Sequence, residues 1–178
     1  MSDYDEIFRQ YLIISGGSQD QDEIQNANAF ITEFQESEEC VHWVIDTFVG
    51  INNANVRIQQ LILIGKWCRF FMDDLPAEVY TAFIQLLFTQ SNHEAFRENE
   101  NYNNKLGDSQ LYFMWRSYPE RWQSFWGDFF DNFDNSYNLN FLSSFTKFVS
   151  SDVLDGRDNM IYNNIKNAMR ASEYDLFI

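Results

Sequence analysis

The rarity of chain-breaking residues is the feature of this sequence that most limits its fold. Only two prolines and seven glycines occur in 178 residues. Chains built from β-strands usually need turn signals about every 8 to 12 residues. Apolar residues instead recur at helical intervals, as Ile24, Ala27, Ile31 and Phe34 do. Because 45% of the residues are apolar, the chain can bury a core. We therefore predict an all-α fold.

The apolar spacing predicts a succession of short helices. Their expected ranges are 3–14, 22–36, 38–50, 53–72, 76–90, 104–117, 119–133, 137–152 and 158–177. Asn53 or Asn55 is expected to cap the fourth helix. Pro76 is expected to open the fifth, because a first helical turn tolerates a missing N–H. The polar run that follows this helix is expected to be a long loop.

Two features favour a repeat architecture. The helix at 53–72 is apolar on most sides, so it must be covered from two directions. Helix corners near residues 37, 75 and 119 recur about every 40 residues, as in HEAT-type repeats. This predicts a right-handed α-solenoid of four antiparallel helix pairs and a final unpaired helix, with residues 1–178 as one segment. A closed helical bundle would have the same local pattern.

Residues 103–130 concentrate aromatic area around one proline. They hold three of the five tryptophans and one of the two prolines. Tyr118 precedes Pro119 and is therefore disfavoured in the α region, so we expect one helix to end there and Pro119 to begin the next. The aromatic side chains should then be buried between these two helices. Trp122 and Phe125 are accordingly assigned to the core and not to a ligand site.

The charge balance limits the partners of the chain. A formal net charge of −15 repels phosphate backbones and disfavours direct nucleic-acid binding by this segment. The same charge is expected either to steer a basic protein partner or to form a solvated surface. Apolar runs such as "LILI" are too short to span a bilayer, and the acidic start lacks a signal peptide. We expect a soluble, intracellular protein in which Cys40 and Cys68 are reduced, partly buried thiols.

Sites for catalysis, metals and cofactors are not predicted. Cys40 and His42 are two positions apart, which on a helix separates their directions by about 200°, so they do not form a thiolate–imidazole pair. His93 is the only other histidine, and no metal-ligand cluster stands out. The segments "GGSQD" and "SDVLDGRDN" lack the residue order of a phosphate loop and of a calcium loop, and are interpreted as turns. We therefore expect neither an enzyme nor a small-molecule substrate.

Four motifs follow one another along the chain. They comprise Ala27, Phe30, Phe34, Ser37 and Trp43; Val56 and Arg57; Asn104 and Lys105, continuing into Arg121, Trp122, Phe125, Trp126 and Asp128; and Asp158, Ile165, Lys166, Met169 and Arg170 within 152–170. In this order they resemble the N-terminal region of exportins in the importin-β (karyopherin) superfamily. The tRNA exportins are the most similar, followed by the exportin-5 type. Ile62 and Asn103 depart from the family pattern, in which Gln and Arg are usual.

This resemblance implies the start of a nuclear export receptor. Residues 1–75 would correspond to the importin-β-like N-terminal part and residues 76–178 to the exportin-1/importin-β-like part of a longer chain. Such a receptor shuttles between nucleus and cytoplasm, contacts nucleoporins, and binds the GTP-bound form of the small GTPase Ran (Ran-GTP) with its N-terminal repeats. The remainder of the chain would hold tRNA or other RNA cargo. The alternative is a HEAT-type scaffold or adaptor without Ran dependence.

The resemblance also indicates which surface would meet Ran. In this superfamily the concave side is lined by the second helix of each pair, here about 22–36, 53–72, 104–117 and 137–150. The polar residues at helical spacing that are candidate Ran contacts are Asn55, Gln59, Lys66, Lys105 and Asp108.

Overall fold

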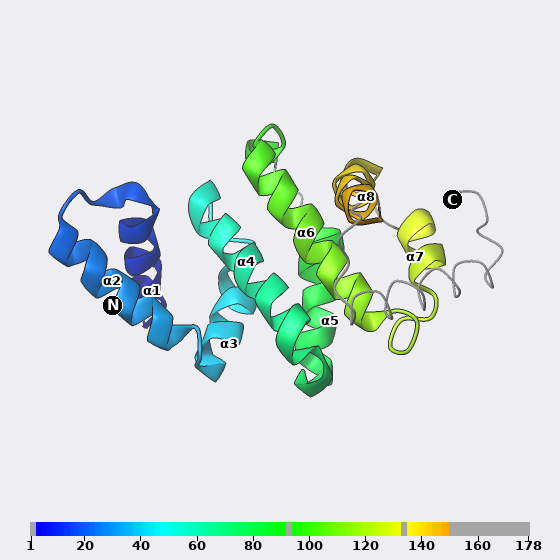
Figure 1. Ribbon diagram of the computed structural model, residues 1–178, viewed down its shortest axis with the longest axis horizontal. Helices are drawn as coiled ribbons and strands as arrows, with labels where there is room; N and C mark the ends of the chain where they lie inside the picture. The colour runs from blue at the N-terminus through cyan, green and yellow to red at the C-terminus, as the bar shows by residue number, and fades with distance from the viewer. Residues whose placement is uncertain (1–2, 92–93, 133–134, 150–178) are drawn as a thin grey trace.

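The computed structural model of the chain describes residues 3–91, 94–132 and 135–149 (Figure 1). Within these ranges the chain forms eight α-helices and no β-strand, which confirms the all-α prediction. The helices are α1 (Asp3–Leu12), α2 (Gln21–Phe34), α3 (Glu38–Thr47), α4 (Ala54–Phe71), α5 (Ala77–Gln85), α6 (Glu100–Ser117), α7 (Phe125–Asn132) and α8 (Asn135–Val149). The helix expected at 158–177 and the last of the four motifs lie outside the described residues.

Side-chain caps fix where three of the helices begin. Asp20 accepts the N–H groups of Asp22 and Glu23, and Asn53 accepts that of Val56, so Asn53 rather than Asn55 caps α4. Asn99 accepts the N–H of Tyr102 and starts α6 at Glu100. The helix expected from residue 104 therefore begins four residues earlier, because a cap within the polar run satisfies its free N–H groups.

Two helices, α4 and α6, run side by side in the same direction at the centre of the molecule (Figure 1). The Ser109 hydroxyl donates to the Leu61 carbonyl oxygen at 2.8 Å, and the Arg116 guanidinium lies 2.7 Å from the Asp73 carboxylate. Both contacts are possible only if residue numbers rise together along the two helices. The α4 helix is also contacted by α1, so it is covered from two directions, as predicted.

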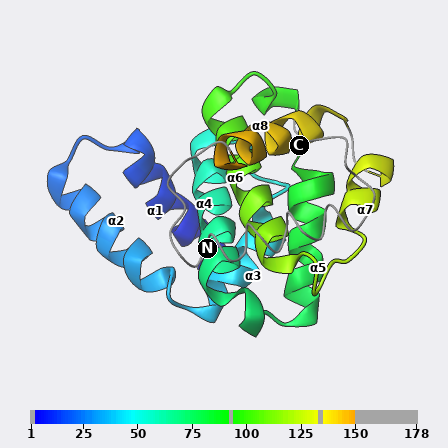
Figure 2. The ribbon, with the colours of Figure 1, turned by 45° about the vertical axis from the view of Figure 1, so that its right-hand side comes forward.

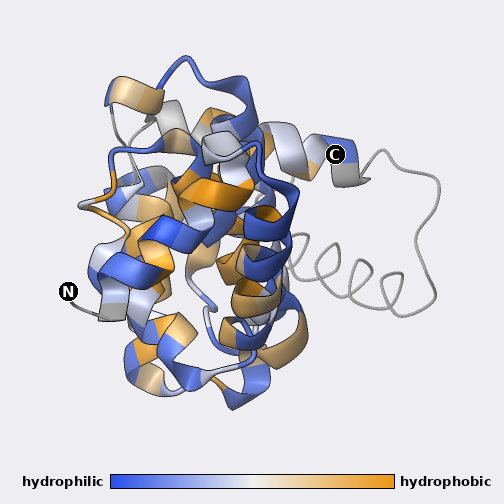
Figure 3. Cartoon of the chain, turned by 90° about the vertical axis from the view of Figure 1, so that its left-hand side faces the viewer, coloured by the Kyte–Doolittle hydropathy of each residue, from blue (hydrophilic) through white to orange (hydrophobic). Residues whose placement is uncertain are grey.

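The arrangement around this pair is less regular. The α1 and α2 helices form the first pair at one end, and Tyr11 on α1 stacks on Trp43 of α3 with ring centroids 4.9 Å apart. The α8 helix crosses α6 steeply: it is seen end-on in Figure 1 and lies across α6 in Figure 2. Hydrophobic and hydrophilic residues alternate around most of the helices (Figure 3), as expected of helices that each bury one side.

The predicted burial of Trp122 and Phe125 is confirmed. Trp122 is 9% exposed and Phe125 is fully buried. Their rings meet at 5.0 Å in an edge-to-face contact, and both contact Phe88, at 5.6 and 5.9 Å. Phe125 also contacts Phe141 of α8. The aromatic stretch therefore joins the α5–α6 region to α8 through one continuous cluster of rings.

The prediction that Pro119 begins a helix is wrong. Tyr118 is extended, as expected, but residues 118–124 form a turn and α7 begins only at Phe125. The Asp128 carboxylate accepts hydrogen bonds from both the Trp122 indole Nε1 and the Ser124 hydroxyl, each at 2.7 Å. These bonds hold the turn in front of α7, with Ser124 directly before the first helical residue. Contacts between side chains thus determine this start more strongly than the proline does.

Gly107 allows the close crossing of α6 and α8. A Cβ atom at this position would overlap the carbonyl oxygen of Asn140 and lie 2.7 Å from Ser144 Oγ. Replacement of Gly107 by Ala should therefore displace α8 and lower the free energy of unfolding by about 1 to 3 kcal/mol, as overpacking does. Urea denaturation measures the change. Gly50→Ala, whose Cβ would meet only the Thr47 carbonyl at 3.7 Å, is the control. Equal stability of the two variants would contradict this packing.

The aromatic cluster predicts a large cost for removing its central indole. We expect Trp122→Ala to lower the free energy of unfolding by about 3 to 5 kcal/mol. The substitution leaves a cavity and removes one of the hydrogen bonds that the Asp128 carboxylate accepts. Phe70→Ala is the matched control, since Phe70 is one of the most exposed aromatic residues. Its change should stay within about 0.5 kcal/mol. A loss below about 1 kcal/mol for Trp122→Ala would show that the cluster is not a core.

Candidate functional site

One stripe of α4 faces away from the core. Asn55, Gln59, Ile62, Lys66 and Phe70 follow one another at intervals of three and four residues, which places them on one side of the helix. Ile62 is 42% and Phe70 is 62% exposed, and Gln59 and Lys66 are half-buried. The three candidates on this helix therefore share one exposed stripe. Asn55 lies at its start, where its amide donates weakly to the Ser15 carbonyl at 3.5 Å.

The neighbouring stripe of α6 carries the other two candidates. Lys105 Nζ lies 3.8 Å from Asp108 Oδ2, and the Ser144 hydroxyl donates to Asp108 Oδ1 at 3.0 Å. Asp108 therefore also holds α8 against α6, so it has a structural role as well as a surface position. Tyr112, one turn further along, is 38% exposed.

The two stripes meet where α4 and α6 approach each other. A Cβ atom at Gly65 would lie only 3.6 Å from the Tyr112 ring. The Arg69 guanidinium covers this junction, 5.3 Å from the centroid of the Phe70 ring and 5.7 Å from that of Tyr112. We call the combined surface the outer face. Its residues are Asn55, Gln59, Ile62, Lys66, Arg69, Phe70, Lys105, Asp108 and Tyr112.

The outer face includes the five candidate residues by definition. Its other members were not selected as contact residues from the sequence. Arg69, Phe70 and Tyr112 were not selected, and Ile62 was noted only as a departure from the family pattern. The available signal was their spacing: Ile62 and Phe70 are each four residues from Lys66. Because α4 is apolar on most sides, this spacing does not by itself separate exposed from buried apolar residues.

Charge is distributed unevenly along the chain. Between Asp3 and Thr47, Arg9 is the only lysine or arginine. The acidic residues in the same span are Asp3, Asp5, Glu6, Asp20, Asp22, Glu23, Glu33, Glu36, Glu38, Glu39 and Asp46. The α4 helix, in contrast, contains three basic residues, Arg57, Lys66 and Arg69, and no acidic residue. The outer face is therefore locally cationic on a chain whose net charge is −15.

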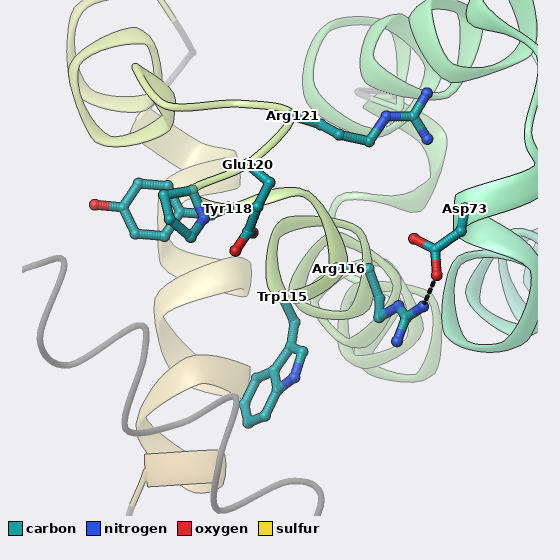
Figure 4. Close-up of a pocket in the computed structure, with 7 residues that line it drawn as sticks. Asp73, Trp115, Arg116, Tyr118, Glu120 and Arg121 are labelled. Carbon is teal, nitrogen blue, oxygen red and sulfur yellow. Dashed lines mark hydrogen bonds and ion pairs between the residues drawn. The ribbon is translucent and has the colours of Figure 1, made fainter.

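A concave region lies at the C-terminal end of α6 (Figure 4). It has a volume of about 230 Å³. Its lining residues are Asp73, Trp115, Arg116, Tyr118, Pro119, Glu120 and Arg121. The Arg116 guanidinium is bound to the Asp73 carboxylate, and Arg121 Nη1 donates to the Met72 carbonyl oxygen at 2.7 Å. Both cations are thus used to attach α6 and the turn that follows it to the end of α4, and we assign this region a structural role.

The buried side chains of Arg57, Cys40 and Cys68 also have structural roles. Arg57, one of the motif residues, is fully buried between the rings of Phe48 and Phe96 and donates to the Val49 carbonyl at 2.7 Å. Cys40 and Cys68 are buried free thiols. Burial raises the pKa of Cys40 to about 12, an effect that the nearby Lys66 cation partly opposes, and burial also raises the pKa of Cys68. Among the described residues, no three metal-binding side chains gather in one place.

The raised pKa values predict unreactive cysteines in the folded protein. Since the thiolate is the nucleophile, a pKa raised above the usual range leaves almost no reactive form at about pH 8. We expect neither thiol to react with Ellman's reagent in the native chain and both to react in guanidinium chloride. Release of one equivalent of thionitrobenzoate from the native chain would show that a cysteine is accessible.

The chain matches none of the protein-family models, curated proteins or solved structures with which it was compared. In the part of the chain that the structure describes, no helix is both long and apolar enough to cross a bilayer. The chemistry of the outer face is therefore the basis on which a function can be proposed.

Proposed function

We propose that this chain is the N-terminal, Ran-GTP-binding part of an exportin-type nuclear export receptor. The observation that carries the proposal is the grouping of Asn55, Gln59, Lys66, Lys105 and Asp108 on the adjoining stripes of α4 and α6. In the solenoid that we propose, these helices would be the second members of successive pairs, the position that lines the concave side in the receptors that the sequence resembles. We assign Ran-GTP to this outer face.

A HEAT-type right-handed solenoid is part of the same proposal. The parallel course of α4 and α6 supports it, because equivalent helices of successive repeats lie side by side in such stacks. The bond from Ser109 to Leu61 joins residues 48 positions apart, which is close to the length of one repeat. The steep crossing of α8 over α6 departs from a simple stack (Figure 2). The pair α7 and α8 would then mark a change in the direction of the solenoid.

The polar groups of the outer face suit a protein partner. Lys66 and Gln59 have no hydrogen-bond or ion-pair partner among the described residues. Both can therefore bind a partner without breaking a hydrogen bond or ion pair within the chain. Lys105 is held beside Asp108 and presents a donor and an acceptor together. The acidic surface of α1 to α3 would attract the basic regions of the same partner. In a longer chain, tRNA or other RNA cargo and nucleoporins would bind to later repeats, and the receptor would shuttle between nucleus and cytoplasm.

A pull-down with the GTP-locked and GDP-bound forms of Ran tests the proposal. We expect this chain to retain Ran-GTP weakly and Ran-GDP not at all, because later repeats and cargo add contacts that strengthen the complex. Charge reversal at Lys66 and Lys105 together should reduce retention at least about fivefold, since it replaces attraction by repulsion at the interface. The circular-dichroism spectrum should not change.

The control is charge reversal at Arg9 and Arg97, which are 59% and 67% exposed and lie off the outer face. This control changes the net charge by the same amount and should not reduce Ran-GTP retention, because reversal at Arg9 adds to the acidity of α1 to α3. Equal retention of Ran-GTP and Ran-GDP would refute the exportin assignment. A nucleotide-independent scaffold would then be the better description of the chain.

A further inference from the structure

Part of the outer face combines exposed aromatic and basic groups. Ile62, Lys66, Arg69 and Phe70 of α4 adjoin Tyr112 of α6, and we call these five residues the aromatic–basic patch. Three of the seven most exposed large apolar side chains among the described residues lie in it. Exposed aromatic rings together with arginine are typical of the centres of protein interfaces.

The patch is not explained by packing within the chain. Phe70 is among the most exposed aromatic side chains, and Lys66 and Arg69 have no carboxylate partner among the described residues. Arg69 instead lies against the Phe70 and Tyr112 rings, which keeps both rings beside a positive charge. Apolar groups that stay exposed in this way add nothing to the core, and they gain free energy only when a partner covers them.

We infer that the aromatic–basic patch docks an acidic amphipathic helix of a partner protein, carrying apolar anchors on one side and carboxylates at its flanks. Ile62 and Phe70 are eight residues apart, which on an α-helix is about 12 Å or two turns. Apolar residues seven or eight positions apart on the docked helix would match this distance. Lys66 and Arg69, between the two anchoring positions, would pair with its carboxylates. This inference goes beyond the proposed function, because docking requires no GTPase.

Two other occupants fit the patch less well. A nucleic acid would meet only two cations here, on a chain with a net charge of −15 that repels phosphates. A second copy of the chain would bring two such charges together. A short acidic helix has a smaller charge, and at physiological salt it interacts mainly with groups within about 8 Å, which favours local complementarity.

The test uses a fluorescein-labelled synthetic helix in which Leu and Phe occupy one side and Glu the remaining positions. Fluorescence anisotropy in about 0.15 M salt should show saturable binding to the chain. A peptide of the same composition in scrambled order should bind at least about tenfold more weakly, because its apolar residues no longer share one side. Lys66→Glu with Arg69→Glu, and separately Phe70→Ser, should each weaken binding by about tenfold or more.

The matched control combines Arg9→Glu and Arg97→Glu with Val49→Ser, which alters exposed residues outside the patch and should leave binding unchanged. All variants should keep the thermal midpoint of the parent chain.

Absence of peptide binding, or binding that the patch variants do not weaken, would overturn the inference. Patch-dependent binding of a uridine oligonucleotide, or a dimer in sedimentation that Phe70→Ser dissolves, would overturn it in favour of RNA or a second copy. Failure of Ran-GTP to bind would leave this inference intact, since the peptide assay contains no GTPase.

Discussion

The contact between α4 and α6 is the constraint on which the rest of the described structure depends. It combines a close approach at Gly65 with a hydrogen bond from the Ser109 hydroxyl to a carbonyl oxygen of α4. That bond ties a buried hydroxyl of α6 to the backbone of α4, which a purely apolar contact would not do. Because the contact fixes both the spacing and the rotation of the two helices, it determines which side chains turn inward to the aromatic cluster. It also determines which residues form the outer face.

Much of the helical structure was predictable because it is encoded locally. The positions of α1 to α4 follow from apolar spacing and from caps such as Asn53, and they agree with the expected ranges within a few residues. Predictions failed where distant side chains decide the outcome. The start of α7 depends on Asp128 binding the Trp122 indole, and the start of α6 depends on Asn99, one polar residue among many in its segment. The steep crossing at Gly107 is likewise a tertiary property that spacing alone does not contain.

The candidate site was predictable only for its polar members. Lys66 and Lys105 were selected as polar residues at helical spacing on helices that the resemblance places at the concave side, and both are partly exposed. Phe70 was not selected because an apolar residue at the end of an apolar helix is normally assigned to the core. The opposite error would be to assign Arg57 to the surface because it is basic and belongs to a motif. It is in fact buried between two aromatic rings. Whether neighbouring elements cover a side chain, and not its residue type, decides if it lies on the outer face or in the core.

The uneven distribution of charge has a consequence for how this chain meets other molecules. Acidic residues outnumber lysine and arginine by 11 to one between Asp3 and Thr47 and by 16 to eight after Phe71, whereas α4 carries three cations and no acidic residue. The sign of the charge therefore changes along the chain, in addition to its net value. A partner with its own separated charges experiences a torque as it approaches and is turned before the surfaces touch. Such preorientation raises the fraction of productive encounters and hence the association rate, while the lifetime of the complex is left to the short-range contacts. Recognition by this chain therefore begins at a distance, with an alignment that added salt would abolish.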